Sequence, residues 1–208
     1  STLFPYTTLF RSLIDRGMPL VVLDKEFTNY EIPSITGDNK DGGRNAAMHL
    51  IECGCKNIAH ITGPMYIEAL EERFNGFKEV LKEENLFRSD FVKVDEFSLK
   101  GGYSATKELL QEENNIDGIF AGNDILAIGS YKALREMGYE LGKDIKLIGY
   151  DGLESNINYL EISSIAQPMY EYGQKGVELL LKKIEGNEDI SKEKIKLNAK
   201  LIKRVSTI

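Results

Sequence analysis

Short apolar runs alternate with amphipathic stretches along most of this sequence. The runs are PLVVLD at 19–24, NIAHIT at 57–62, FVKVD at 91–95, GIFA at 118–121 and IKLIGYD at 145–151. They are rich in β-branched and aromatic residues and are bounded by glycine, proline or aspartate, which is typical of buried strands. Strands that alternate with helices build a parallel sheet covered by helices on both faces. The sequence therefore predicts an α/β fold.

Apolar residues recur at helical spacing between the predicted strands. The three clearest stripes are Leu70, Phe74, Phe77 and Leu81; Ala127, Tyr131 and Leu134 before Gly138; and Val177, Leu180, Leu181 and Ile184 before Gly186. We expect each stripe to face a core, and the two glycines fit the ends of their helices. Near the end of the chain, Ile195, Leu197, Ala199 and Leu201 alternate with polar residues, which predicts one half-exposed edge strand.

Composition and charge narrow the possible partners. The 208 residues are 42% hydrophobic, which is enough for a normal core, and the net charge of -7 argues against wrapping nucleic acid with this segment. No apolar run is long enough for a membrane-spanning helix, and the first residues lack the order of a signal peptide. We therefore expect a cytoplasmic protein that makes no membrane contact.

The sequence offers no catalytic, metal or cofactor motif. Cys53 and Cys55 form a C-x-C pair, which we interpret as free thiols, and we expect His49 on a helix face and His60 on a strand. DGGRNA at 41–46 lacks the glycine spacing of a nucleotide-binding loop, and no Ser-His-Asp or Cys-His order is present. We expect no enzyme activity, no cofactor and no metal site.

The first twelve residues, STLFPYTTLFRS, fit neither the helical nor the strand period well. They resemble translated sequencing-adapter sequence more than a protein element. We therefore expect residues 1–12 to be a non-native segment.

Polar side chains follow several predicted strands at the point where each strand ends. They are Asp24, Asn123, Asp151 and Gln167. The carboxyl ends of parallel strands share one edge of a sheet, which is where open α/β sheets bind ligands. The alternative is helix capping, which suits Asn123 or its neighbour Asp124 but suits a glutamine before proline poorly.

Arg73 and Phe97 complete the candidate set. Arg73 lies early in a predicted helix, where its guanidinium either binds hydroxyls or a carboxylate or pairs with Glu72 or Glu79 along the helix. Phe97 either stacks on an apolar ligand face or fills the core. Carboxylate, amide and guanidinium groups beside an aromatic ring suit a polyhydroxylated ligand such as a sugar.

The chain from Leu13 onward resembles the effector-binding core of lactose-repressor-type (LacI/GalR) transcription regulators. The resemblance rests on colinear segments that include RGMPLVVLDKE, SITGDNKDGGRNAAMHLIECGCKNIAHITGP, ERFNGFKEVL, GIFAGNDILAIGSYKALREMGYELGKDIKLIGYDG, SSIAQPMYEYGQKGVELLLKKI and KLIKRVST. It implies a periplasmic-binding-protein-like fold, in which two parallel-sheet lobes are joined by crossovers. Lys25 and Gly152 depart from the common pattern, which more often has arginine and aspartate there.

The resemblance also assigns lobes and ligand contacts. Residues 13–37 and 168–190 would be the remnant of an incomplete N-terminal lobe, and residues 38–167 and 191–208 the C-terminal lobe. The ligand-binding residues would be Asp24, Arg73, Phe97, Asn123, Asp151 and Gln167. In this assignment Asn123 faces the ligand and Asp124 caps the helix.

Two functions follow from the resemblance. The first is a ligand-sensing domain of a repressor: a small effector, a sugar, would modulate DNA binding by an N-terminal helix-turn-helix that is missing from this sequence, in a homodimer. The second is a periplasmic or extracellular sugar-binding protein of an ABC transporter. The ending LIKRVST and the regulator-like DNKDGGRNAAMHLIECG favour the repressor.

Overall fold

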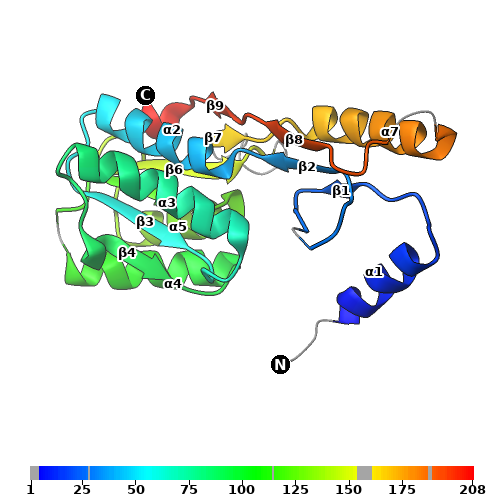
Figure 1. Cartoon of the computed structure of the whole chain (residues 1–208). Coiled ribbons are helices and arrows are strands. Elements are labelled where there is room, and N and C mark those ends of the chain that lie inside the picture. The colour runs from blue at the N-terminus through cyan, green and yellow to red at the C-terminus, as the bar shows by residue number, and fades with distance from the viewer. Residues whose placement is uncertain (1–4, 28, 114, 154–160, 187–188) are drawn as a thin grey trace. The chain divides into compact units, whose positions relative to one another are not determined.

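The structure, a computed structural model, describes residues 5–27, 29–113, 115–153, 161–186 and 189–208 (Figure 1). The chain divides into two compact units. The first comprises Ser1–Gly37 and Pro168–Leu197, and the second comprises Asp38–Gln167 and Asn198–Ile208. The chain therefore passes from one unit to the other after Gly37, after Gln167 and after Leu197.

The first unit is built on a parallel sheet in the order β1-β2-β8. Its elements are α1 (Pro5–Asp15), β1 (Val22–Leu23), β2 (Ser34–Gly37), α7 (Met169–Glu185) and β8 (Lys194–Leu197). The core contains Ile35 of the central strand with Tyr172 and Leu179 of α7. Helix α7 ends at Gly186, whose φ of 69° is the left-handed conformation that glycine adopts without strain.

The second unit contains a six-stranded sheet in the order β4-β3-β5-β6-β7-β9. The strands are β3 (Ile58–Thr62), β4 (Val92–Val94), β5 (Gly118–Ala121), β6 (Lys146–Asp151), β7 (Ser163–Ala166) and β9 (Lys200–Ile202). The pairings from β4 through β7 are parallel, and β9 is antiparallel to β7. The helices are α2 (Asn39–Glu52), α3 (Glu68–Glu83), α4 (Leu99–Glu112) and α5 (Asp124–Glu136), with short 3-10 turns at Ser89–Phe91 and Val205–Thr207.

Helices cover both faces of this sheet (Figure 1). Phe120 and Ile148 pack with residues of α2 and α3, whereas their neighbours Ile119 and Leu147 pack with residues of α4 and α5. Successive strand residues point to opposite faces, so a strand buried on both faces is mostly apolar along its whole length. The two α/β units with mostly parallel sheets confirm the fold class expected from the sequence.

One strand is shorter than predicted, and another was not predicted. The run at 19–24 forms a strand only at Val22–Leu23, because β1 pairs with β2 at just these residues and lies at the edge of its sheet. The polar stretch Ser34–Gly37 does not have the pattern of a strand, yet it is the central one, with β1 on one side and β8 on the other.

The predicted single edge strand near the end of the chain is wrong. β8 pairs in parallel with β2 of the first unit, whereas β9 pairs in antiparallel with β7 of the second. Residues 191–197, predicted for the C-terminal lobe, therefore belong to the first unit. A single alternating pattern runs through both strands, so the sequence does not reveal the change of sheet.

The apolar stripe predicted in α7 does not face the core: Val177, Leu181 and Ile184 are more than half exposed, and the helix packs through Tyr172 and Leu179 instead.

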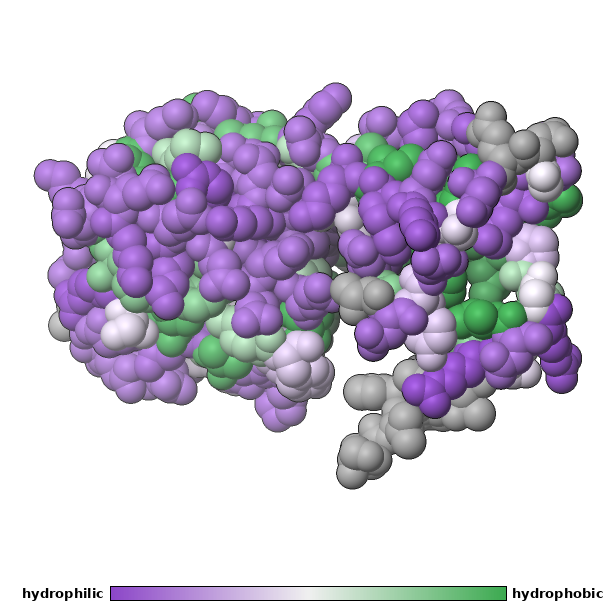
Figure 2. Space-filling view, viewed as in Figure 1, coloured by the Kyte–Doolittle hydropathy of each residue, from purple (hydrophilic) through white to green (hydrophobic). Residues whose placement is uncertain are grey.

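Several other local expectations are met. His49 lies on α2, His60 on β3, and both cysteines are free thiols. Residues 5–15 form a helix although their sequence fits the period poorly, and Phe10 stacks on Phe27 at 4.3 Å between ring centres. No helix among the described residues is long and apolar enough to cross a membrane. In Figure 2 the visible face of the second unit is covered mainly by hydrophilic residues.

Candidate functional site

A buried ion pair lies at the carboxyl edge of the six-stranded sheet. Nη2 of Arg73, on α3, lies 3.1 Å from Oδ1 of Asp151, the last residue of β6. The Arg73 side chain is only 4% exposed, and a guanidinium at that depth is stable only when acceptors surround it. The alternative prediction, in which Arg73 pairs with Glu72 or Glu79 along its own helix, is wrong, since its charged partner comes from a distant strand.

Three further groups fix the Arg73 guanidinium. Nε donates to Oδ1 of Asn39 at 2.9 Å, Nη1 donates to the carbonyl of Gly122 at 2.8 Å, and Cζ lies over the Tyr150 ring, 3.6 Å from its centre. Helix α2 brings Asn39 close to the Arg73 side chain because α2 and α3 pack tightly against each other at Gly43. A Cβ on Gly43 would lie 2.0 Å from the Arg73 carbonyl oxygen.

Asp151 is held in a conformation that few residues with a side chain adopt. Its φ is 104°, and Gly152 follows at 77°. Backbone strain of this kind persists only where the surroundings enforce it, and it concentrates at functional sites. Here the Gln167 amide donates to Asp151 Oδ1 at 2.8 Å, and the Gln167 N–H donates to the Asp151 carbonyl at 3.1 Å.

The second carboxylate oxygen of Asp151 faces no protein donor among the described residues. Arg73 and Gln167 both contact Oδ1, and none of the described side chains or N–H groups donates to Oδ2. Burial raises the pKa of Asp151, while Arg73 and Gln167 oppose that rise by favouring the charged form. The pair thus offers an acceptor oxygen beside the remaining N–H groups of a guanidinium, an arrangement that can bind hydroxyl groups.

The helix cap predicted at Asp124 is wrong, because Asn123 caps α5 instead. Oδ1 of Asn123 caps α5 by accepting from the Leu126 N–H at 2.8 Å, and the extended backbone at Asn123 suits a cap. Capping uses the oxygen, so the amide nitrogen is the atom that remains for a ligand. Asp124 does not cap the helix, because its carboxylate points to β7 and to the segment after Asp151.

Asp124 is a fully buried carboxylate. Oδ1 accepts from the Ser164 hydroxyl at 2.8 Å, and Oδ2 accepts from the Leu153 N–H at 2.7 Å. Burial raises the pKa of Asp124 to about 7, although these two donors favour the charged form. Ser164 also accepts from the Gly152 N–H at 3.1 Å. Asp124 and Ser164 therefore fix the segment that immediately follows Asp151.

Phe97 and Asp24 are the two other predicted site residues. Phe97 is 43% exposed and lies beside Gly63, where an added Cβ would come within 2.9 Å of its ring. It does not fill the core, which was one of the two expectations for it. Asp24 belongs to the first unit, just after β1, with a φ of 59° and its N–H bonded to the Ile35 carbonyl.

Sequence reasoning missed Asn39 and Tyr150. Asn39 stands in the polar stretch GDNKDGG, where an amide is typical of a turn, and Tyr150 looks like an ordinary strand residue. The glycine at position 42 is the sequence feature connected with Tyr150. It leaves the space that the tyrosine ring occupies, since a Cβ on Gly42 would lie 2.6 Å from Cε2 of that ring.

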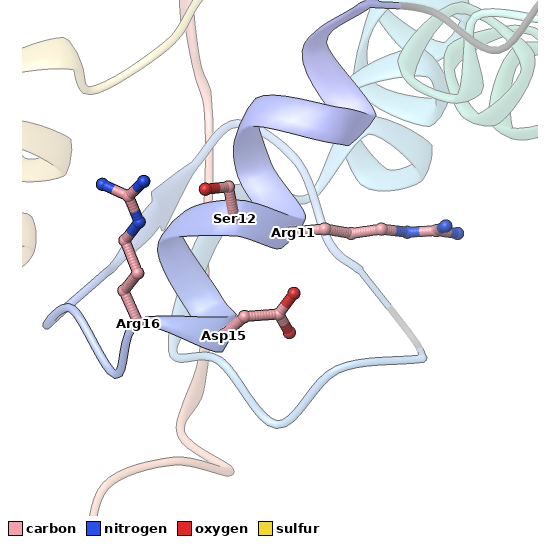
Figure 3. Close-up of a pocket in the computed structure, with 4 residues that line it drawn as sticks. All are labelled: Arg11, Ser12, Asp15 and Arg16. Atoms are coloured by element: carbon pink, nitrogen blue, oxygen red, sulfur yellow. The ribbon is translucent and has the colours of Figure 1, made fainter.

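One pocket of the first unit contains none of the predicted site residues. The pocket drawn in Figure 3 is lined by Arg11, Ser12 and Asp15 of α1 and by Arg16, which follows the helix. Within the described parts of the chain, no group of histidine, cysteine or acidic residues is arranged to hold a metal ion.

Comparison with known proteins identifies the class. The family described as periplasmic binding protein-like domain matches residues 47–207. The chain therefore belongs to the periplasmic-binding-protein-like family, with the effector-binding fold of LacI-type regulators.

Individual relatives make the relationship more specific. The ribose operon repressor of Halalkalibacterium halodurans is 35% identical over 92% of this chain and 57% of its own length. The transcriptional repressor PurR of Mannheimia succiniciproducens is 28% identical over 91% of this chain and 57% of its own length. The structure of a LacI family regulator from Enterococcus faecium, solved with bound ribose, matches this chain with a TM-score of 0.85 and 33% sequence identity. The match covers 100% of this chain and 75% of the regulator's chain. The chain spans a little over half of the two curated repressors, and these relatives are regulators rather than enzymes.

Proposed function

We propose that this chain is the ligand-sensing domain of a LacI-family transcriptional repressor and that it binds a small sugar. The observation that carries the proposal is the Arg73–Asp151 pair, in which Oδ2 of Asp151 faces no donor from the described residues. A sugar hydroxyl both donates and accepts a hydrogen bond, so a carboxylate oxygen beside a guanidinium matches it. The matched ribose repressor and the ribose-bound regulator support ribose as the first ligand to test.

The further ligand contacts are proposed from the same resemblance. Asn123 would donate through its amide nitrogen, Gln167 would extend the polar edge next to Asp151, and Phe97 would pack on the apolar face of the sugar. Asp24 would contribute a carboxylate from the first unit. We include no catalytic residue, cofactor or metal ligand in this site.

The protein's partners follow from the repressor proposal. Operator DNA would be bound through an N-terminal helix-turn-helix in a homodimer, and the protein would act in the cytoplasm. Effector binding would change the affinity for DNA, and couplings of this kind typically amount to about 1–3 kcal/mol. The matched relatives are repressors, so the exported binding protein of a transporter, the other function expected from the sequence, is not proposed.

Thermal-shift screening of the protein tests the proposal. The panel contains ribose, other pentoses, hexoses, their phosphates and purines, and ribose comes first because one matched relative is a ribose operon repressor. We expect ribose to raise Tm progressively with its concentration, as linkage requires of a ligand that binds only the folded state. Arg73→Ala should abolish this shift.

A matched control separates the site from general charge effects. Arg88→Ala removes an arginine that pairs with Asp90 on the surface, and this variant should retain the full ribose shift. A shift with a purine instead of ribose would replace the sugar by a purine effector. No shift with any member of the panel, from folded protein, would remove the sensing proposal.

A further inference from the structure

Asn39 lies where the chain enters the second unit. It is the second residue after the boundary at Gly37, it begins α2, and it is 5% exposed. Its Oδ1 accepts from Nε of Arg73 at 2.9 Å. A residue at the passage between the two units thus contacts the guanidinium of the proposed site directly.

Gln167 makes a parallel contact at the next passage. It is the last residue of the second unit before the boundary at Pro168, and its amide donates to Asp151 Oδ1 at 2.8 Å. Hydrogen bonds and the ion pair therefore connect Asn39, Arg73, Asp151 and Gln167 in one continuous line. Both ends of this line lie at points where the chain crosses between units.

The geometry gives Asn39 a specific task. Stacking on Tyr150 restrains the tilt of the Arg73 guanidinium, but it leaves rotation within the plane. The hydrogen bond from Nε to Asn39 and the bond from Nη1 to the Gly122 carbonyl fix that rotation from two sides. The contact of Nη2 with Asp151 is a third restraint, but Asp151 belongs to the proposed ligand site. Of the two anchors outside that carboxylate, Asn39 is the one that acts through a side chain.

We propose that Asn39 is a positioning residue that orients Arg73 for ligand binding. Its contact fixes where the remaining N–H groups of Arg73 point, so the guanidinium meets a ligand without a further loss of side-chain freedom. The same contact connects the proposed site to the point at Gly37 where the chain enters the second unit. The effect on affinity rests on the proposed function, whereas the effect on Arg73 does not.

Three variants test the proposal. Asn39→Ala removes the acceptor, Asn39→Asp keeps an acceptor at the same place, and Asn45→Ala is the matched control. Asn45 lies on the same helix, but its amide donates to Asp41. Circular dichroism and Tm establish that each variant is folded.

The first readout needs no ligand. It is the hydrogen exchange of the Arg73 Nε–H in nitrogen-15 correlation spectra, with the signal assigned by its loss in Arg73→Lys. We expect slow exchange in the wild type, Asn39→Asp and Asn45→Ala, and fast exchange in Asn39→Ala. Unchanged protection in Asn39→Ala would overturn the proposal.

The second readout is ribose affinity by calorimetry. We expect Asn39→Ala to bind roughly ten-fold or more weakly, as for loss of a charge-assisted hydrogen bond, and Asn39→Asp and Asn45→Ala to stay near wild type. An Asn39→Ala protein with lowered Tm but wild-type affinity would show a merely structural role and contradict the proposal. If the wild type itself fails to bind ribose while the exchange pattern holds, the proposed ligand is wrong and the positioning role stands.

Discussion

Replacing Asp124 by asparagine should change how the stability of this protein depends on pH. Asp124 is fully buried, and burial raises the pKa of its carboxyl from 3.8 to about 7. In the unfolded chain the group returns to its ordinary pKa. Between these two values the folded protein therefore holds a proton that the unfolded chain has released.

The sign and the magnitude follow from this difference. The folded state binds more protons, so the contribution of this group to the free energy of unfolding rises as pH falls from about 7 toward 3.8 and declines as pH rises. A shift of about three pH units corresponds to roughly 4 kcal/mol, and one proton limits the slope to about 1.4 kcal/mol per pH unit. The amide that replaces the carboxyl does not titrate, so the comparison of wild type with Asp124→Asn isolates the contribution of this carboxyl from all others.

The assay is urea unfolding followed by circular dichroism at pH 4, 5, 6, 7 and 8. We expect the wild type to gain stability relative to Asp124→Asn as the solution is acidified. Ser164→Ala removes a hydrogen bond that favours the charged form, so it should move the pH dependence toward higher pH. A difference between wild type and Asp124→Asn that is independent of pH, or that grows with rising pH, would refute the reasoning.

Three further substitutions probe the same unit. Asn123→Ala removes the cap of α5 and should cost about 1 kcal/mol in urea unfolding, whereas an unchanged stability would argue against the cap. Gly43→Ala places a methyl group against the Arg73 carbonyl and should lower stability by about 1–3 kcal/mol and weaken ribose binding; a stabilised variant would contradict the close packing of the two helices. Burial lowers the pKa of His60 to about 4, so the folded state resists protonation, and up to about 3 kcal/mol of stability should be lost as pH falls from 6.5 to 4. His60→Phe, which suits a ring that stacks on Phe120, should remove this loss, and an equally steep loss in that variant would show that other groups cause it.

The fold was largely predictable from the pattern of apolar runs. Parallel strands buried on both faces are mostly apolar, so GIFA and LIGY stand out against the amphipathic helices around them. The pattern fails where a strand lies at an edge or is polar, as at Val22–Leu23 and Ser34–Gly37. At these positions, pairing with a neighbouring strand determines whether a strand forms. The polar strand β2 pairs with β8, which lies far away in the sequence.

The sequence predicted the polar residues at the strand ends of the candidate site, but it did not predict the residues that hold them in place. Polar residues at strand ends pointed to Asp151 and Gln167, which the structure brings together. Which of two adjacent residues caps a helix depends on a single hydrogen bond, so the sequence pattern leaves Asn123 and Asp124 as alternatives, and the cap assigned to Asp124 from the resemblance is wrong. Asn39 supports Arg73 through the approach of two helices, which no local pattern encodes.

Calorimetric titration of ribose into the wild type and into Asp151→Asn tests the central claim most directly. The substitution keeps the size of the side chain but removes the charge that pairs with Arg73 and the carboxylate whose Oδ2 faces no donor from the described residues. We predict saturable binding to the wild type and a loss of at least about ten-fold in affinity for the variant, with both proteins folded. Equal affinity in the two proteins would contradict the assignment of the Arg73–Asp151 pair as the ligand-binding site.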